Sequence, residues 1–282
     1  MMFKYSFDSL VYFGENVEKS IERVAKFGYN AIELVGEPTA YDTSKVRNIV
    51  SDYGITVGSI CSIYNAERDL AHPDPAKRQQ AIDYVKSVAD MSAEVGCPVM
   101  IVAPTANGKT ASLTEFSDEW KWAVEGIQEG AEYAAKLKVN LCIEAWNRYE
   151  TYMLNRLDQA LDMWKEVNLP NVGIMGDTFH MNIEEENIAD AIRQSGDALI
   201  HIHLADSNRK APGLGHIDFA PVLEALKDID YKGHLTFEIL PAAADPFGVM
   251  KKGGGLEFFD DYTKKSIDYI KSIEKSLFAK TL

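Results

Sequence analysis

The sequence repeats one pattern eight times: a short apolar run that suits a buried strand, followed by a stretch with the spacing of an amphipathic helix. The expected strands are Phe3–Asp8, Ala31–Val35, Thr56–Ile63, Val99–Pro104, Asn140–Trp146, Val172–Asp177, Leu199–Asp206 and His234–Leu240. The clearest expected helices are Val17–Phe27, Ala76–Val95, Asp118–Leu137, Arg156–Val167, Glu185–Gln194, Phe219–Leu226 and Asp260–Leu277. Eight such units predict an α/β fold, a single-domain (β/α)8 TIM barrel over residues 1–282.

An open, doubly wound sheet is the alternative architecture for alternating strands and helices. It normally has fewer strands, and a dinucleotide-binding version carries a glycine-rich turn after its first strand. Here the segment after the first expected strand holds a single glycine, Gly14. The barrel is therefore the preferred prediction.

Net charge and cysteine content limit the kinds of binding partner and the cellular compartment that are expected for this protein. The formal net charge is −14, and such a surface repels phosphate backbones and anionic lipid headgroups. The three cysteines are far apart and show no CxxC spacing, which suits a reducing compartment. No apolar run reaches the roughly 20 residues of a membrane span, and the first residues lack the apolar segment of a secretory signal. We expect a cytoplasmic protein that binds neither nucleic acid nor membranes.

Acidic residues and histidines gather where the later strands end, which is where barrel enzymes carry their catalytic groups. Side chains alternate between the two faces of a strand. In each of strands five to eight the large apolar residues share one phase, and the opposite phase holds one polar residue near the strand end. These four inward-facing residues are Glu144, Asp177, His203 and Glu238.

Three carboxylates in one dry cavity would repel one another, so some would take up protons unless a cation neutralised them. Three carboxylates and one imidazole suit Mn²⁺, Mg²⁺ or Co²⁺ better than a thiolate-type zinc site. The sequence therefore predicts one divalent metal held by these four residues. His201 lies one inward layer deeper, where a supporting hydrogen bond is expected rather than ligation. Glu33, at the end of the second expected strand, is a further polar strand-end residue.

Five segments of the second half carry a family resemblance. They are IEAWNRYETYMLN, GDTFHMNIEE, HIHLADSNR, PGLGHIDF and FEIL, in this order between Leu141 and Leu240. They resemble the ketose 3-epimerases, the D-tagatose, D-psicose and L-ribulose 3-epimerase group of the xylose-isomerase-like sugar isomerase and epimerase barrels. The loop after strand four and the segment after Glu238 depart from the family pattern, so the chemistry carries over better than the identity of the sugar.

The resemblance implies roles for seven residues and an assembly. Glu144, Asp177, His203 and Glu238 would bind one divalent metal, usually Mn²⁺, with Co²⁺ or Mg²⁺ as alternatives. Glu144 and Glu238 would also be the catalytic acid/base pair. Glu150, His180 and Arg209 would hold the O1–O2 end of a small-molecule sugar substrate. The family further implies a homodimer or homotetramer.

These roles predict a metal-dependent epimerase that inverts C3 of a ketose. One glutamate would remove the C3 proton to form an enediolate, and the other would return a proton to the opposite face. An aldose–ketose isomerase would need nearly the same groups. A metal-dependent lyase or dehydratase that acts on a keto sugar or an inosose would begin with the same deprotonation. All three activities remain open, as does the choice between a free sugar and a sugar phosphate.

Two other classes of protein and two short motifs fit the sequence less well. A DNA-repair endonuclease of the same superfamily would need three metals and more histidines, and a sugar-binding barrel without activity would not need two opposed glutamates. Asn107–Thr110 reads NGKT, but a phosphate-binding loop would require glycine where Ala103 stands. Lys251–Gly255 reads KKGGG and could cradle a phosphate, although a surface loop is the simpler interpretation.

Overall fold

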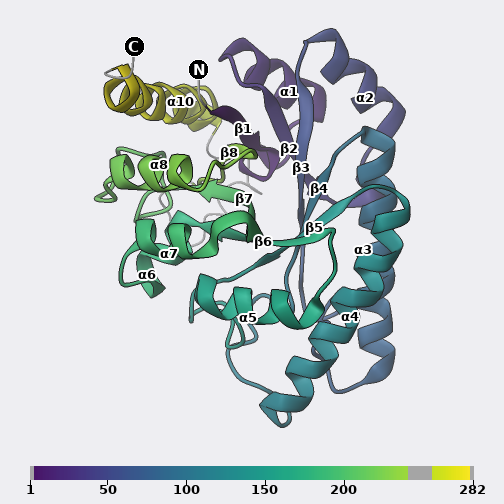
Figure 1. The fold of residues 1–282 in the computed structure, drawn as a ribbon. Coiled ribbons are helices and arrows are strands. Elements are labelled where there is room, and N and C mark those ends of the chain that lie inside the picture. The colour runs from purple at the N-terminus through teal and green to yellow at the C-terminus, as the bar shows by residue number, and fades with distance from the viewer. Residues whose placement is uncertain (1–2, 241–255, 280–282) are drawn as a thin grey trace.

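The computed structural model describes residues 3–240 and 256–279, and its centre is a closed barrel of parallel strands (Figure 1). The strands pair in chain order from β1 to β8, and β8 closes the barrel against β1. They are β1 (Lys4–Asp8), β2 (Ala31–Gly36), β3 (Thr56–Ser62), β4 (Val99–Val102), β5 (Asn140–Glu144), β6 (Val172–Asp177), β7 (Leu199–Leu204) and β8 (His234–Phe237). This topology confirms the predicted (β/α)8 TIM barrel. Lys251–Gly255 lie outside the described residues.

Helices surround the strands on the outside of the barrel (Figure 1). They are α1 (Val17–Lys26), α2 (Thr43–Asp52), α3 (Pro75–Val95), α4 (Phe116–Lys136), α5 (Leu157–Val167), α6 (Thr178–Glu184), α7 (Ile188–Ser195), α8 (Phe219–Asp228) and α10 (Leu256–Phe278). Across the described ranges, no helix is both long enough and apolar enough to span a membrane.

The ends of α3 show how local sequence sets the element boundaries. Asp74 accepts a hydrogen bond from the backbone N–H of Ala76, and Pro75 occupies the first turn, where its missing N–H costs nothing. Gly96 ends the helix at φ 75°, a left-handed conformation that glycine adopts without a Cβ clash. The chain can therefore turn directly into β4.

One predicted helix is wrong in its extent. The sequence pattern predicts a helix over Glu185–Gln194, whereas the structure starts α7 at Ile188 and forms a separate, unpredicted helix, α6, that ends at Glu184. The break arises because Glu185 accepts a hydrogen bond from the backbone of Leu157, and Asn187 caps α7 by accepting from the N–H of Asp190.

The interior of the barrel is layered, and this layering positions the site. Cys61, Ile101, Cys142 and Met175 form an apolar cluster separate from the main core between strands and helices. Two of these residues stand two positions before a polar residue of the predicted site, so the next inward layer of their strands is polar. The apolar cluster thus forms a floor beneath the candidate site.

Candidate active site

The four predicted metal ligands converge inside the barrel at the carboxyl ends of its strands. All are at most 8% exposed. Ligand atoms of Glu144, Asp177 and His203 lie within 4.8 Å of one another. The Nδ1 atom of His203 is 3.0 Å from Oε2 of Glu238 and 3.9 Å from Oδ2 of Asp177. The barrel therefore gathers side chains from four consecutive strand ends into one group.

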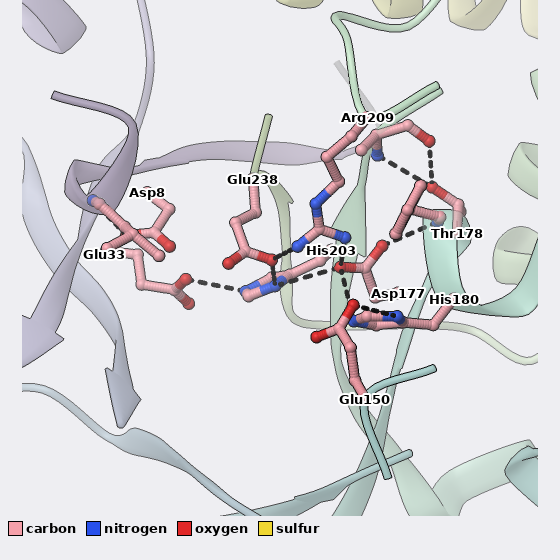
Figure 2. Close-up of polar contacts among 12 residues, drawn as sticks. Asp8, Glu33, Glu150, Asp177, Thr178, His180, His203, Arg209 and Glu238 are labelled. Atoms are coloured by element: carbon pink, nitrogen blue, oxygen red, sulfur yellow. Dashed lines mark hydrogen bonds and ion pairs between the residues drawn. The ribbon is translucent and has the colours of Figure 1, made fainter. Parts of the chain in front are cut away.

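The three predicted sugar-binding residues border this group (Figure 2). One N–H of the Arg209 guanidinium donates to Asp177 at 2.5 Å, and another donates to Glu238. His180 places Nε2 4.0 Å from Oδ2 of Asp177 and Nδ1 3.9 Å from Oε1 of Glu150. The structure thus places all seven predicted residues in one continuous cluster.

Arg209 is held at the site by an unusual backbone conformation. Its φ is 63°, a left-handed value that is uncommon for residues other than glycine. Its backbone N–H donates to Asp206, and its carbonyl accepts from Leu240. Its guanidinium also stacks over the ring of Phe179 at 4.8 Å. These contacts fix the loop after β7 so that the guanidinium faces the carboxylates.

The acidic groups of the cluster differ in their affinity for protons. Burial raises the pKa of Glu144 to about 8, with Glu238 and Asp177 adding to this effect and His203 opposing it. Burial acts in the same direction on Glu238, but Arg209 and His203 outweigh it and bring the pKa of Glu238 to about 2. Without a bound cation, the two candidate acid/base residues therefore hold opposite protonation states at neutral pH.

His180 is a neutral imidazole with a defined tautomer. Burial lowers its pKa to about 3. The backbone N–H of Asn147 donates to Nδ1 at 3.3 Å, and the side-chain Nδ2 of Asn147 lies 2.7 Å from the same atom. Because Nδ1 accepts, the ring hydrogen sits on Nε2, the nitrogen nearer Asp177. His180 can therefore donate one hydrogen bond into the cavity.

Sequence reasoning missed the role of Asn147 and the placement of two acidic residues. Asn147 donates to Oε1 of Glu150 at 2.8 Å, so one amide orients two predicted sugar-binding residues. The sequence predicts Glu33 only as a polar residue at a strand end, whereas it lies within β2 and both its oxygens face histidines of β7. Asp8 is fully buried, and burial together with Glu33 and Glu238 raises its pKa well above the ordinary value. Asn147 directly follows Trp146 in the segment IEAWNRYETYMLN, and this position in the resembling segment was the signal that could have indicated it.

The residues of the cluster fit a divalent cation. Asp8, Glu33, Glu144, Asp177 and Glu238 are all buried carboxylates, and the permanent positive charge that contacts them among residues 3–240 is that of Arg209. Such an excess of negative charge at low dielectric is stable only with further cations or bound protons. An added divalent ion would supply that charge.

Three combinations of described residues bring potential metal ligands together. Glu33, His201 and His203 form the first, but each oxygen of Glu33 is already 2.8 Å from an imidazole nitrogen. Asp8, Glu33 and Cys61 form the second, in which burial raises the pKa of the thiol and disfavours the thiolate ligand. Glu144, Asp177 and His203 form the third, and Glu144 also lines the open cavity. The third combination is the best metal site of the three.

A cavity of about 1610 Å³ opens above the cluster. Its walls include Glu144, Glu238, His180 and Arg209, together with Trp146, which is 8% exposed. Trp146 therefore faces the cavity as its strand phase predicts. A small sugar can reach both candidate acid/base residues from this space.

The NGKT segment contacts Glu150, one of the predicted sugar-binding residues. The side-chain amide of Asn107 donates to Oε2 of Glu150 at 2.7 Å, and the N–H of Gly108 donates to the carbonyl of Glu150 at 2.8 Å. Nζ of Lys109 lies 2.8 Å from Asp69 and 2.7 Å from Glu119 in a nearly dry environment. The turn after β4 thus contacts Glu150 through Asn107 and Gly108, and the ion pairs of Lys109 hold this turn in place.

Replacing Lys109 by methionine is expected to lower the free energy of unfolding by about 3–5 kcal/mol, because two buried carboxylates would lose their counter-ion. Denaturant unfolding followed by circular dichroism measures this change. Lys121→Met is the matched control, since Lys121 is exposed and pairs with Glu125 at 3.8 Å. That control should change the free energy by less than about 0.5 kcal/mol. Equal effects of both substitutions would contradict the importance of the ion cluster.

Comparison with known proteins gives a consistent set of relatives. The family model described as "Xylose isomerase-like TIM barrel" matches residues 21–271. The chain is 34% identical over 227 residues to D-psicose 3-epimerase of Ruminiclostridium cellulolyticum, and the matched region covers 77% of this chain and 76% of the relative. It is 28% identical over 242 residues to 3-dehydro-D-guloside 4-epimerase of Escherichia coli, and this match covers 83% of the chain and 91% of the relative. The crystal structure of D-allulose 3-epimerase from Methylomonas sp. in complex with D-allulose matches with a TM-score of 0.87 at 29% identity, covering 96% and 97% of the two chains.

Proposed function

Because the chain belongs to the xylose isomerase-like TIM barrel family and is a sugar epimerase related to the ketose 3-epimerases, we propose that it inverts C3 of a ketose between Glu144 and Glu238. The resemblance noted in the sequence is confirmed by these relatives. One observation carries the proposal: the two glutamates, from β5 and from the end of β8, line the same cavity beside a buried Asp–His pair.

The proposed reaction includes one divalent metal ion, with Mn²⁺ as the first choice and Co²⁺ or Mg²⁺ as alternatives. Glu144, Asp177, His203 and Glu238 would hold it, since their ligand atoms gather at one point. When bound, such an ion polarises the substrate carbonyl and so makes the neighbouring C–H more acidic.

The side chains of the protein perform the proton transfers in this scheme. One of the two glutamates accepts the proton from C3, and the other donates a proton to the opposite face of the same carbon. The charge that develops on the sugar oxygens is met by the guanidinium of Arg209 and the Nε2–H of His180, both of which face the cavity. Glu150, oriented by Asn107 and Asn147, accepts a hydrogen bond from a sugar hydroxyl.

Turnover in D₂O tests the position of the chemistry. We expect deuterium at C3 of both epimers when the Mn²⁺-supplemented protein is incubated with ketohexoses and ketopentoses, because the returned proton comes from a glutamate that exchanges with solvent. Proton NMR of the sugars measures the label. Deuterium at C1 or C2 instead would indicate aldose–ketose isomerisation, and loss of water from the sugar would indicate a dehydratase. Either outcome would contradict C3 epimerisation.

A keto sugar with an additional substituent is the second candidate substrate. The cavity of about 1610 Å³ exceeds the roughly 300–1,000 Å³ that usually encloses a small ligand. The Escherichia coli relative is named for a 3-dehydro-guloside, which is a sugar of this larger kind. Comparing kcat/KM for free ketoses and for 3-keto glycosides separates the two substrates.

A further inference from the structure

We propose that Glu33 is a positioning residue that holds the His203 ring in the orientation its metal-binding role requires. The inference rests on the proposed function, because it assumes that His203 binds a metal. Glu33 is the third residue of β2 and is fully buried. It touches neither the cavity nor the proposed substrate, so its effect would act through His203.

The two nitrogens of His203 face different partners (Figure 2). Nε2 lies 2.8 Å from Oε1 of Glu33, whereas Nδ1 points to Glu238 at 3.0 Å and to Asp177 at 3.9 Å. Nε2 of His203 and Oε1 of Glu33 are both buried, and neither has another hydrogen-bond partner in the described part of the chain. A hydrogen bond between Nε2 of His203 and Oε1 of Glu33 would therefore satisfy both buried atoms.

This arrangement assigns a different task to each ring nitrogen. A histidine that binds a metal presents a lone pair on one nitrogen and usually donates the N–H of the other to a carboxylate or carbonyl, which fixes the tautomer and the ring orientation. Here the Nε2–H faces Glu33, so the lone pair of Nδ1 is left toward Asp177 and Glu238.

Glu33 is itself held from the far side, which makes it a fixed support. Its Oε2 lies 2.8 Å from Nε2 of His201 and also accepts a hydrogen bond from the hydroxyl of Ser59. The rings of His201 and His203 contact edge to face with centroids 5.0 Å apart. The predicted supporting role of His201 therefore has a specific partner, and a shift of Glu33 would disturb both rings.

Mn²⁺ titration of the metal-free protein by isothermal calorimetry tests the inference. Glu33→Gln keeps the side-chain size but replaces the charged acceptor, and we expect Mn²⁺ to bind about 10- to 100-fold more weakly than to the wild type. Glu274→Gln is the matched control: Glu274 is also a buried carboxylate and accepts from the N–H of Phe3 and the hydroxyl of Tyr5, away from the cluster. The control should bind Mn²⁺ with unchanged affinity.

Two further measurements separate positioning from general destabilisation. Glu33→Asp keeps the charge but is one methylene shorter, so it should also weaken Mn²⁺ binding by about tenfold, and it serves if Glu33→Gln does not fold. The visible absorption spectrum of the Co²⁺-loaded protein should change in either Glu33 variant and not in Glu274→Gln, because it reports the ligands around the ion. Wild-type affinity and spectrum in a folded Glu33 variant would overturn the inference. A wild-type protein that binds no Mn²⁺ would instead overturn the proposed metal site.

Discussion

Replacing Glu144 or Glu238 by glutamine is expected to lower kcat by about 10²–10⁴-fold while the barrel stays folded. Glutamine has nearly the size of glutamate, so packing around these buried side chains is kept. It can neither accept the C3 proton nor return one. Epimerisation needs both transfers, so the loss of either glutamate should suffice.

The assay should be run at saturating Mn²⁺, because both residues are also proposed metal ligands. Circular dichroism checks the fold, and Glu125→Gln is the control at an exposed position. In D₂O each variant keeps one base, so it should still exchange the C3 hydrogen of one epimer without inverting it, and the two variants should select opposite epimers. Near-normal kcat in either variant, or exchange of the same epimer by both, would contradict the two-base scheme.

Removing the metal with a chelator is expected to abolish turnover, and adding Mn²⁺ or Co²⁺ should restore it. A bound divalent ion contributes several kcal/mol to stabilising the transition state, which corresponds to a loss of about a thousandfold or more in rate. Removal also leaves the carboxylates Glu144, Asp177 and Glu238 without a cation at low dielectric.

Two readouts accompany this experiment. Elemental analysis gives the metal content per chain, and thermal unfolding should show a higher Tm for the Mn²⁺-loaded protein, because a ligand that binds the native state stabilises it. Full activity in a protein shown to be free of metal would reject the site. Restoration of activity without a rise in Tm would argue that the ion binds elsewhere than in the buried cluster.

Much of the fold could be predicted because the barrel depends on a repeated local pattern. All eight strands were identified, and the range predicted for β6 matches the structure at both ends. The sequence did not predict bounds for helix α2, because its apolar face is narrow: its buried residues are Val46 and Val50. Helix α6 was not predicted, and α7 starts three residues later than predicted, because the break between them depends on Glu185 accepting a hydrogen bond from Leu157, a contact between distant segments.

Local sequence patterns are enough to predict which residues meet at the carboxyl ends of β5 to β8. The two-residue period of a strand sets the inward phase, and neighbouring strands in a barrel follow chain order, so Glu144, Asp177, His203 and Glu238 were expected together. The contacts across the barrel interior arise from closure of the barrel and could not be predicted from these patterns. Glu33 and His201 are separated by 168 positions yet lie 2.8 Å apart. No local period encodes that distance, because it is fixed only when the sheet closes and side chains from non-adjacent strands share one buried space.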